Sequence, residues 1–276
     1  MLSMLAQIAP IPGFNEPFSS LSHYLGAAVF AVLGVVLIAR GRGDRVRVAA
    51  LSVYVFTLLF MLSMSGTFHL VRRGTVAHEV IGRLDYASIF LLIAGTFTPP
   101  HAILFRGWGR WGAIALIWTI AVVGVTFKAI FYQQFTHGIS VVIFIAMGWI
   151  GAFGGAVAWR RYGFEFVKPL FAGALAYTIG ALFEVMGTIL VRFPAVDEWY
   201  EEVAQQWLFW PGVIESHEIW HVAVLLGAAF HWAFIYQFAD GSAPPVIDRA
   251  SKHRPAEQVT SQATAARPAE TASREL

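Results

Sequence analysis

Seven apolar stretches constrain the fold of this chain more than any other feature of its sequence. Each is close to the roughly 20 residues that a helix needs to cross the hydrocarbon core of a bilayer. Hydrophobic residues make up 57% of the 276 residues and charged residues only 13%, whereas about a quarter of an ordinary soluble domain is charged. The sequence therefore predicts an all-α membrane protein, a bundle of seven transmembrane helices at Leu21–Ile38, Val48–Leu70, Leu84–Leu104, Trp111–Phe131, Gly138–Trp159, Pro169–Val191 and Ile219–Phe238.

The segments between and around these stretches suggest three regions. Residues 1–20 form an N-terminal segment with no Lys or Arg, which makes a poor signal peptide, so we expect the first apolar stretch to be a permanent span. Residues 21–238 form the transmembrane domain, in which the acidic and aromatic connection Arg192–Ser216 suits a short interfacial helix. Residues 239–276 are rich in Pro, Ala, Ser, Thr and charge, and we expect a disordered cytoplasmic tail.

Charge predicts an orientation and excludes some partners. With seven spans, most of the 19 Lys and Arg residues fall on the side of the C-terminal tail. The positive-inside rule therefore predicts a protein of the cell (inner) membrane with its N-terminus outside and its C-terminus in the cytoplasm. The net charge is only +2 and the basic residues are dispersed, so nucleic acid is not an expected partner.

Polar residues within the spans are concentrated at one end of the predicted bundle. Ser65 and His69 lie in the last turns of the second span, Asp85 opens the third, and His217 and His221 open the seventh. Because the chain crosses the bilayer once per span, these groups lie on the same side, together with Glu16 and His23. Polar groups in spans are costly, so this concentration predicts a functional site.

The histidine spacing predicts a zinc site near one face of the membrane. His217 and His221 are four residues apart and share one helical face, where both can reach one metal ion; His69 would provide a third nitrogen. The chain has no cysteine, so a transition metal must be held by imidazole and carboxylate. Three protein ligands and one open position are typical of catalytic zinc. Asp85 is then the expected base, and Ser65 would orient water or a substrate carbonyl.

Other polar groups allow further interpretations. His217-Glu218-x-x-His221 also matches the zincin motif, which keeps an intramembrane metallopeptidase open as a weaker hypothesis. His231 is too deep for the same metal and is expected to be a packing residue, and His101 ends the third span on the opposite side. We expect Lys128 to snorkel to the interface, and the prolines of GTFTPP to end or bend the third span.

Four strings carry a resemblance to a known family. NEPFSSLSHYLG, SGTFH, RLDYASIFLLIAGTFTP and SHEIWHVAVLLGAAFHW occur in the expected order on the expected spans. They resemble the haemolysin III branch of the progestin and adipoQ receptor family, which is distantly related to the alkaline ceramidases. The resemblance implies seven helices around a cavity, zinc held by His69, His217 and His221, and Asp85 and Ser65 beside the zinc site. It also implies hydrolysis of a lipid amide such as ceramide, although the eukaryotic members are receptors.

These observations support one principal function and two alternatives. The first is a zinc-dependent hydrolase of membrane lipids, with ceramide or another acyl amide as substrate. The second is a zinc-stabilised receptor or regulator of membrane lipid state without turnover. A pore is less well supported, because pores need polar groups along a whole passage and here they gather at one end. The family resemblance leaves the orientation open, since its receptors place the zinc in the cytoplasm and the ceramidases have the opposite sense.

Overall fold

A computed structural model describes residues 14–132, 137–190 and 216–246, and within these ranges the chain forms seven long helices and no strand. All seven are long and apolar enough to cross a membrane. This confirms the predicted all-α bundle of seven membrane-spanning helices. The helices are α1 (Pro17–Arg40), α2 (Arg45–Leu70), α3 (Val76–Leu104), α4 (Trp108–Ile130), α5 (His137–Tyr162), α6 (Phe164–Leu190) and α9 (Ser216–Tyr236).

Local capping residues decide where several helices begin. The Asp44 side chain accepts a hydrogen bond from the Arg47 backbone N–H at 2.9 Å and starts α2, and Thr75 accepts one from the His78 N–H at 3.2 Å and starts α3. The Thr75 cap starts α3 at Val76, eight residues before the predicted span at Leu84. Asp85 therefore lies more than two turns inside the helix.

The two prolines of GTFTPP do not end the third helix. Pro99 and Pro100 both lie inside α3, which continues to Leu104. A proline removes one backbone donor, and neighbouring groups in a membrane helix can compensate. The carbonyls that lose their usual backbone donor are those of Gly95 and Thr96, four residues before each proline. The prediction that the prolines end or bend the third span is therefore not met as an end of the helix.

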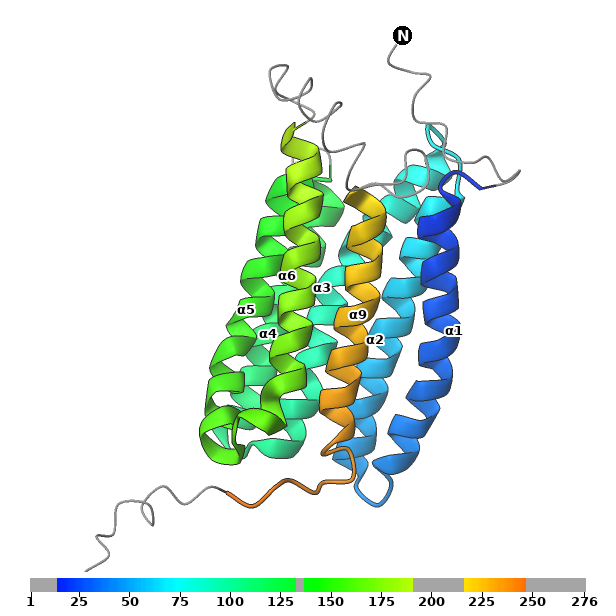
Figure 1. The fold of residues 1–276 in the computed structure, drawn as a ribbon. Coiled ribbons are helices and arrows are strands. Elements are labelled where there is room, and N and C mark those ends of the chain that lie inside the picture. The colour runs from blue at the N-terminus through cyan, green and yellow to red at the C-terminus, as the bar shows by residue number, and fades with distance from the viewer. Residues whose placement is uncertain (1–13, 133–136, 191–215, 247–276) are drawn as a thin grey trace, which may run out of the picture. The chain divides into compact units, whose positions relative to one another are not determined.

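The helices pack mainly against their neighbours in the chain, and α9 closes the arrangement. Helix α9 lies against α6 and also against α1, so the last helix connects the first helix of the chain with the sixth (Figure 1). The larger apolar core lies mainly among α1, α2, α6 and α9 and includes the fully buried Leu37, Leu62 and Ile235. A smaller core around Phe90 and Phe144 joins α3, α4 and α5.

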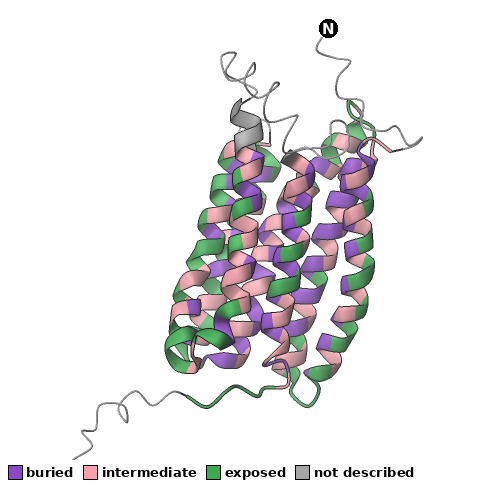
Figure 2. Ribbon diagram, viewed as in Figure 1, coloured by how far each residue is buried: buried purple, intermediate pink, exposed green. Residues whose placement is uncertain are grey.

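Many outward side chains of the bundle are large and apolar. Val32 and Val35 on α1 are 67% and 68% exposed, and Phe153 on α5 is 84% exposed. Figure 2 shows exposed residues distributed along the outer faces of the helices. A soluble protein rarely exposes so much contiguous apolar surface, whereas a lipid bilayer covers it without cost. The burial pattern is therefore that of a protein surrounded by lipid.

Lys128 differs from the sequence prediction. Its ammonium group does not snorkel to an interface: the residue is 5% exposed. It donates to the Ser140 hydroxyl of α5 at 2.9 Å and lies 4.0 Å from the centre of the Tyr86 ring of α3. The hydrogen bond and the cation–π contact compensate for its burial. Lys128 thus joins three helices at the same end of the bundle as the histidines.

The two ends of the bundle are defined by chain topology. At one end Arg40 of α1 forms an ion pair with Asp240, just beyond α9, at 2.8 Å, so the loop after α1 and the start of the tail share that end. The polar residues named above lie at the other end.

The predicted interfacial helix at Arg192–Ser216 falls outside the described residues except for Ser216, which begins α9. The predicted disordered tail falls outside them from residue 247 onward.

Close packing of α2 against α3 leads to a first prediction. A Cβ atom at Gly95 would overlap the Thr57 hydroxyl, and Thr57 is buried and β-branched, so it cannot move aside easily. We expect Gly95→Ala to destabilise the protein, since overpacking costs about 1–3 kcal/mol against a gain in helix propensity of about 1 kcal/mol. Thermal unfolding in detergent measures the change. Gly148→Ala is the matched control, because a Cβ there meets no atom within 4 Å, and an equal loss in both variants would contradict the packing argument.

Candidate metal centre

Three imidazole rings meet at the end of the bundle. His69 lies in the last turn of α2, and His217 and His221 lie one turn apart near the start of α9. The Nε2 atom of His217 is 3.4 Å from that of His69 and 3.1 Å from that of His221. His69 and His221 are buried and His217 is half-buried. The three residues predicted from topology and spacing therefore converge, and could together hold a metal ion.

Each ring also contacts a polar group through its other nitrogen, Nδ1. His69 donates to the carboxylate of Glu16, which precedes α1. His217 donates to Glu184 of α6 at 3.1 Å, and Nδ1 of His221 lies 2.8 Å from Nε2 of His23 on α1. Metal-ligating histidines usually have such partners, which fix the orientation and tautomer of the ring. The rings are therefore held from α1 and α6, not only from their own helices.

This arrangement decides which nitrogens can bind a metal. A carboxylate only accepts hydrogen bonds, so neutral His69 and His217 carry their protons on Nδ1 and present a bare lone pair at Nε2. Two lone pairs 3.4 Å apart repel each other. A cation between them removes the repulsion and uses both as ligands. The residues present therefore fit a metal ion bound through three Nε2 atoms.

Glu16 is held as a carboxylate by its surroundings. It is 6% exposed, and it accepts hydrogen bonds from His69 and from the largely exposed guanidinium of Arg73. Burial alone would raise the pKa of Glu16, but the hydrogen bond with His69 and the positive charge of Arg73 oppose it, and the pKa is lowered to about 2. The negative charge beside His69 therefore persists at neutral pH.

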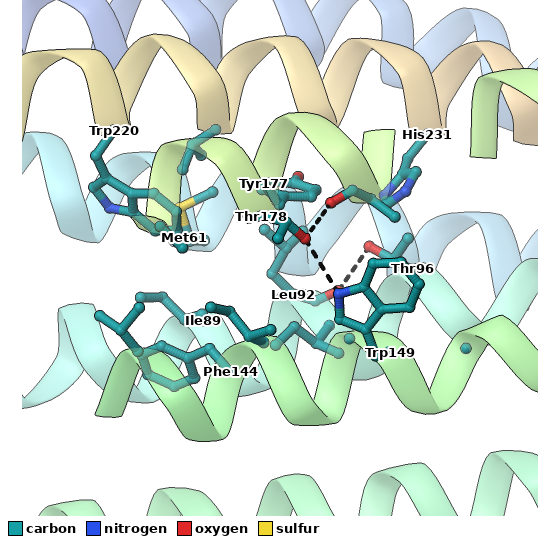
Figure 3. Close-up of a pocket in the computed structure, with 18 of the residues that line it drawn as sticks. Met61, Ile89, Leu92, Thr96, Phe144, Trp149, Tyr177, Thr178, Trp220 and His231 are labelled. Carbon is teal, nitrogen blue, oxygen red and sulfur yellow. Dashed lines mark hydrogen bonds between the residues drawn. The ribbon is translucent and has the colours of Figure 1, made fainter. Parts of the chain in front are cut away.

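A cavity of about 470 Å³ opens beside the three histidines and runs into the bundle. Asp85 of α3 and the buried Ser65 of α2 both line it, as do all three histidines. The next part of the cavity is apolar, and Figure 3 shows Met61, Ile89, Phe144 and Trp220 facing the space there. The two predicted catalytic residues are therefore placed in the same cavity as the histidines, at the end of a long apolar chamber.

Glu218 and His101, two further polar residues considered in the sequence, each form a hydrogen bond with a group outside the three histidines. Glu218 accepts a hydrogen bond from Ser19 of α1 at 3.3 Å and is not among the described residues that line the cavity, which removes support from the zincin interpretation. His101 bonds to the Gly109 carbonyl at 2.8 Å. It lines the far end of the cavity, away from the three histidines.

Glu184 is a residue of the candidate centre that the sequence analysis missed. It is 7% exposed and is the partner of His217. A signal was present: Glu184 is an acidic residue inside an apolar stretch (GALFEVMG), and such a residue in a span is a functional candidate by default. The sixth span also ends on the same side as the second.

Comparisons with known proteins agree with this architecture. The family described as haemolysin-III related matches residues 13–232, a range that contains every residue of the centre. Over 217 residues the chain is 28% identical to Hemolysin-3 of Bacillus cereus, covering 78% of this chain and 87% of that protein. It is 21% identical to the Hemolysin-3 homolog of Bacillus subtilis, covering 78% and 90%. It is 29% identical over 200 residues to Heptahelical transmembrane protein ADIPOR2 of Oryza sativa, covering 66% and 79%.

The partner of His217 can be tested by metal binding alone. Glu184→Gln keeps the size of the side chain but replaces the carboxylate that orients His217, and the loss of such a partner typically weakens metal affinity by about 10–100-fold. Competition of the purified protein with a chromophoric chelator measures this change. Glu165→Gln, at the exposed start of α6, is the control and should bind like the unchanged protein. Equal affinity of both variants would mean that Glu184 does not support a metal ligand.

Proposed function

The chain belongs to the haemolysin III branch of the progestin and adipoQ receptor family, and on that basis we propose that it is a zinc-dependent hydrolase of membrane lipid amides. The observation that carries the proposal is the meeting of three imidazole Nε2 atoms at the polar end of an otherwise apolar cavity inside the membrane bundle. Such a cavity suits an acyl chain, and its polar end suits the bond that joins the chain to a head group.

The choice of zinc follows from ligand type and spacing. Imidazole suits zinc, and the chain has no cysteine to favour a softer metal. Two nitrogens each 2.0–2.1 Å from a tetrahedral zinc ion lie about 3.3 Å apart. The Nε2 distances of 3.1 and 3.4 Å are close to this value. Three protein ligands also leave one position open, as in catalytic zinc sites.

The residues around the metal would divide the work of amide hydrolysis. Zinc bound to His69, His217 and His221 would supply Lewis acidity toward a carbonyl oxygen and a water molecule. The Asp85 carboxylate would accept a proton from the attacking water and return it to the amine as the C–N bond breaks, which yields a carboxylic acid and a free amine. The Ser65 hydroxyl would donate to the substrate carbonyl oxygen and orient it.

The cavity walls would exclude competing reactions. The side chains between the centre and the middle of the bundle are mainly apolar, so water would reach the scissile bond mainly from the polar end. A dry site strengthens each hydrogen bond and charge interaction within it.

A receptor or regulator of membrane lipid state would use the same pocket without turnover. A metal-loaded protein that binds acyl amides but does not cleave them would favour that alternative.

The proton-transfer role gives a direct test. Asp85→Asn removes the base but leaves the three imidazoles, so we expect metal content to stay unchanged while turnover of acyl amides falls about 100–10,000-fold. Metal analysis and hydrolysis of a fluorescent ceramide, measured on the same preparation, separate the two effects. Asp44→Asn, an exposed helix cap at the other end of the bundle, is the control. Full activity of Asp85→Asn would remove Asp85 as the base.

We also propose that the metal centre lies at the outer face of the cell membrane, with the C-terminal tail in the cytoplasm, because positive charge concentrates on the tail side. The chain has no cysteine, so single introduced cysteines report topology without background. In intact cells a membrane-impermeant maleimide should label Ala77→Cys, at the exposed start of α3, and not Ala243→Cys, beyond α9. Labelling of Ala243→Cys alone would reverse the orientation.

A further inference from the structure

The deep part of the cavity contains a second group of polar side chains, well away from the metal centre. Thr96 of α3, Trp149 of α5, Thr178 of α6 and His231 of α9 all line the cavity there, and Figure 3 shows them together beyond the apolar stretch. We call these four residues the deep polar cluster. His231 follows His221 by ten residues on the same helix, which corresponds to about 15 Å along the axis. No part of the hydrolysis described above requires them.

His231 presents a hydrogen-bond acceptor that has no partner among the described residues. Its Nε2 lies 3.3 Å from the Leu170 carbonyl oxygen; since a carbonyl only accepts, Nε2 carries the proton. In the neutral ring Nδ1 is then a bare acceptor, and it is buried and unpaired within the described part of the chain. His231 itself is only 9% exposed. Buried polar atoms are nearly always paired, so an unpaired one calls for an explanation.

A glycine allows this position of the ring. A Cβ atom at Gly173 of α6 would lie 2.7 Å from Nε2 of His231 and 3.1 Å from the Gly227 carbonyl oxygen. Only a residue without a side chain lets α6 and α9 approach so closely with the imidazole between them. The Tyr177 ring, one turn further along α6, also packs against the imidazole, with its centre 5.4 Å from that of His231. The ring is therefore held in place by its surroundings.

The two threonines also present acceptors. Thr96 donates its proton to the Leu92 carbonyl at 2.8 Å, and Thr178 donates to the Ala174 carbonyl at 2.8 Å. A hydroxyl oxygen that donates its one proton still has two lone pairs. Trp149 donates to the Thr178 oxygen at 3.2 Å and so uses one of them. Lone pairs of Thr96, Thr178 and His231 therefore remain for a ligand, and the matching ligand group is a donor.

We propose that the deep polar cluster binds a hydroxyl group carried in the middle of an acyl chain. This inference rests on the proposed function for the acyl nature of the ligand, and it narrows the substrate class to hydroxylated acyl lipids. The apolar stretch between the metal centre and the cluster would hold methylene groups, and the hydroxyl would donate to His231 or a threonine. A site built to accept a hydrogen bond discriminates against ligands that lack the donor, because its own polar group then stays buried and unpaired.

Three fatty acids that differ at one carbon test the proposal by binding alone. Ricinoleic acid is oleic acid with a hydroxyl in the second half of the chain, and its keto analogue has an acceptor at the same carbon but no donor. Displacement of a fluorescent fatty acid from the purified, metal-loaded protein gives the three affinities. We expect ricinoleic acid to bind about tenfold more tightly than both others. Equal affinities would overturn the inference and leave the proposed function intact, whereas no binding of any fatty acid would count against both.

Variants of the same shape can show which residues of the deep polar cluster cause the preference for ricinoleic acid. His231→Phe keeps a ring against Gly173, and Thr96→Val keeps the shape of the side chain, but each removes an acceptor. At least one of them should lose the preference for ricinoleic acid while binding oleic acid as before. Thr119→Val is the matched control, because Thr119 makes the same bond to the carbonyl four residues earlier on an exposed face of α4. A preference that survives in both cluster variants, with unfolding temperatures unchanged, would overturn the proposal.

Discussion

The structure depends on bringing three imidazole nitrogens together inside a membrane bundle. His69 and His217 are 148 residues apart in the chain, yet their Nε2 atoms lie 3.4 Å from each other. With Nδ1 protonated toward Glu16 and Glu184, these nitrogens present lone pairs that repel. A bound cation turns the repulsion into attraction and would tie α2 to α9. Glu16 and His23 connect the centre to α1, and Glu184 connects it to α6. One ion would therefore hold four helices in fixed positions relative to one another.

The membrane setting explains why so few polar groups carry the site. Each buried polar group must find a partner, because lipid supplies none. At the centre Glu16 and Glu184 accept hydrogen bonds from Nδ1 of His69 and Nδ1 of His217. Lys128 meets the same requirement with Ser140 and the Tyr86 ring. Among the described histidines, Nδ1 of His231 and Nδ1 of His23 are buried without a hydrogen-bond partner. His23 lies beside the metal centre, whereas His231 lines the deep part of the cavity, where its unpaired nitrogen indicates a ligand more clearly than an exposed polar residue would.

The cavity connects these two polar regions through an apolar passage. One end has a proposed metal, a carboxylate and a hydroxyl, and the other end has the acceptor lone pairs of Thr96, Thr178 and His231. A ligand that satisfies both ends needs a polar head, an apolar chain and a donor some distance along it. In a pore, by contrast, polar groups would line a continuous path. The zincin interpretation requires Glu218 at the metal, whereas Glu218 accepts a hydrogen bond from Ser19 and does not line the cavity.

The sequence by itself determined the number of spans, the end at which the polar groups gather, and the three converging histidines. Those features depend on local hydrophobicity, on crossing parity and on the four-residue period of a helix, all of which are written in the order of residues. Only the tertiary structure decided the start of α3 and hence the depth of Asp85, the burial of Lys128, the turn of Glu218 away from the cavity, and the pairing of Glu184 with His217. These depend on how helices rotate about their axes and which neighbours they meet, and an almost uniformly apolar helix carries little pattern from which that rotation can be predicted.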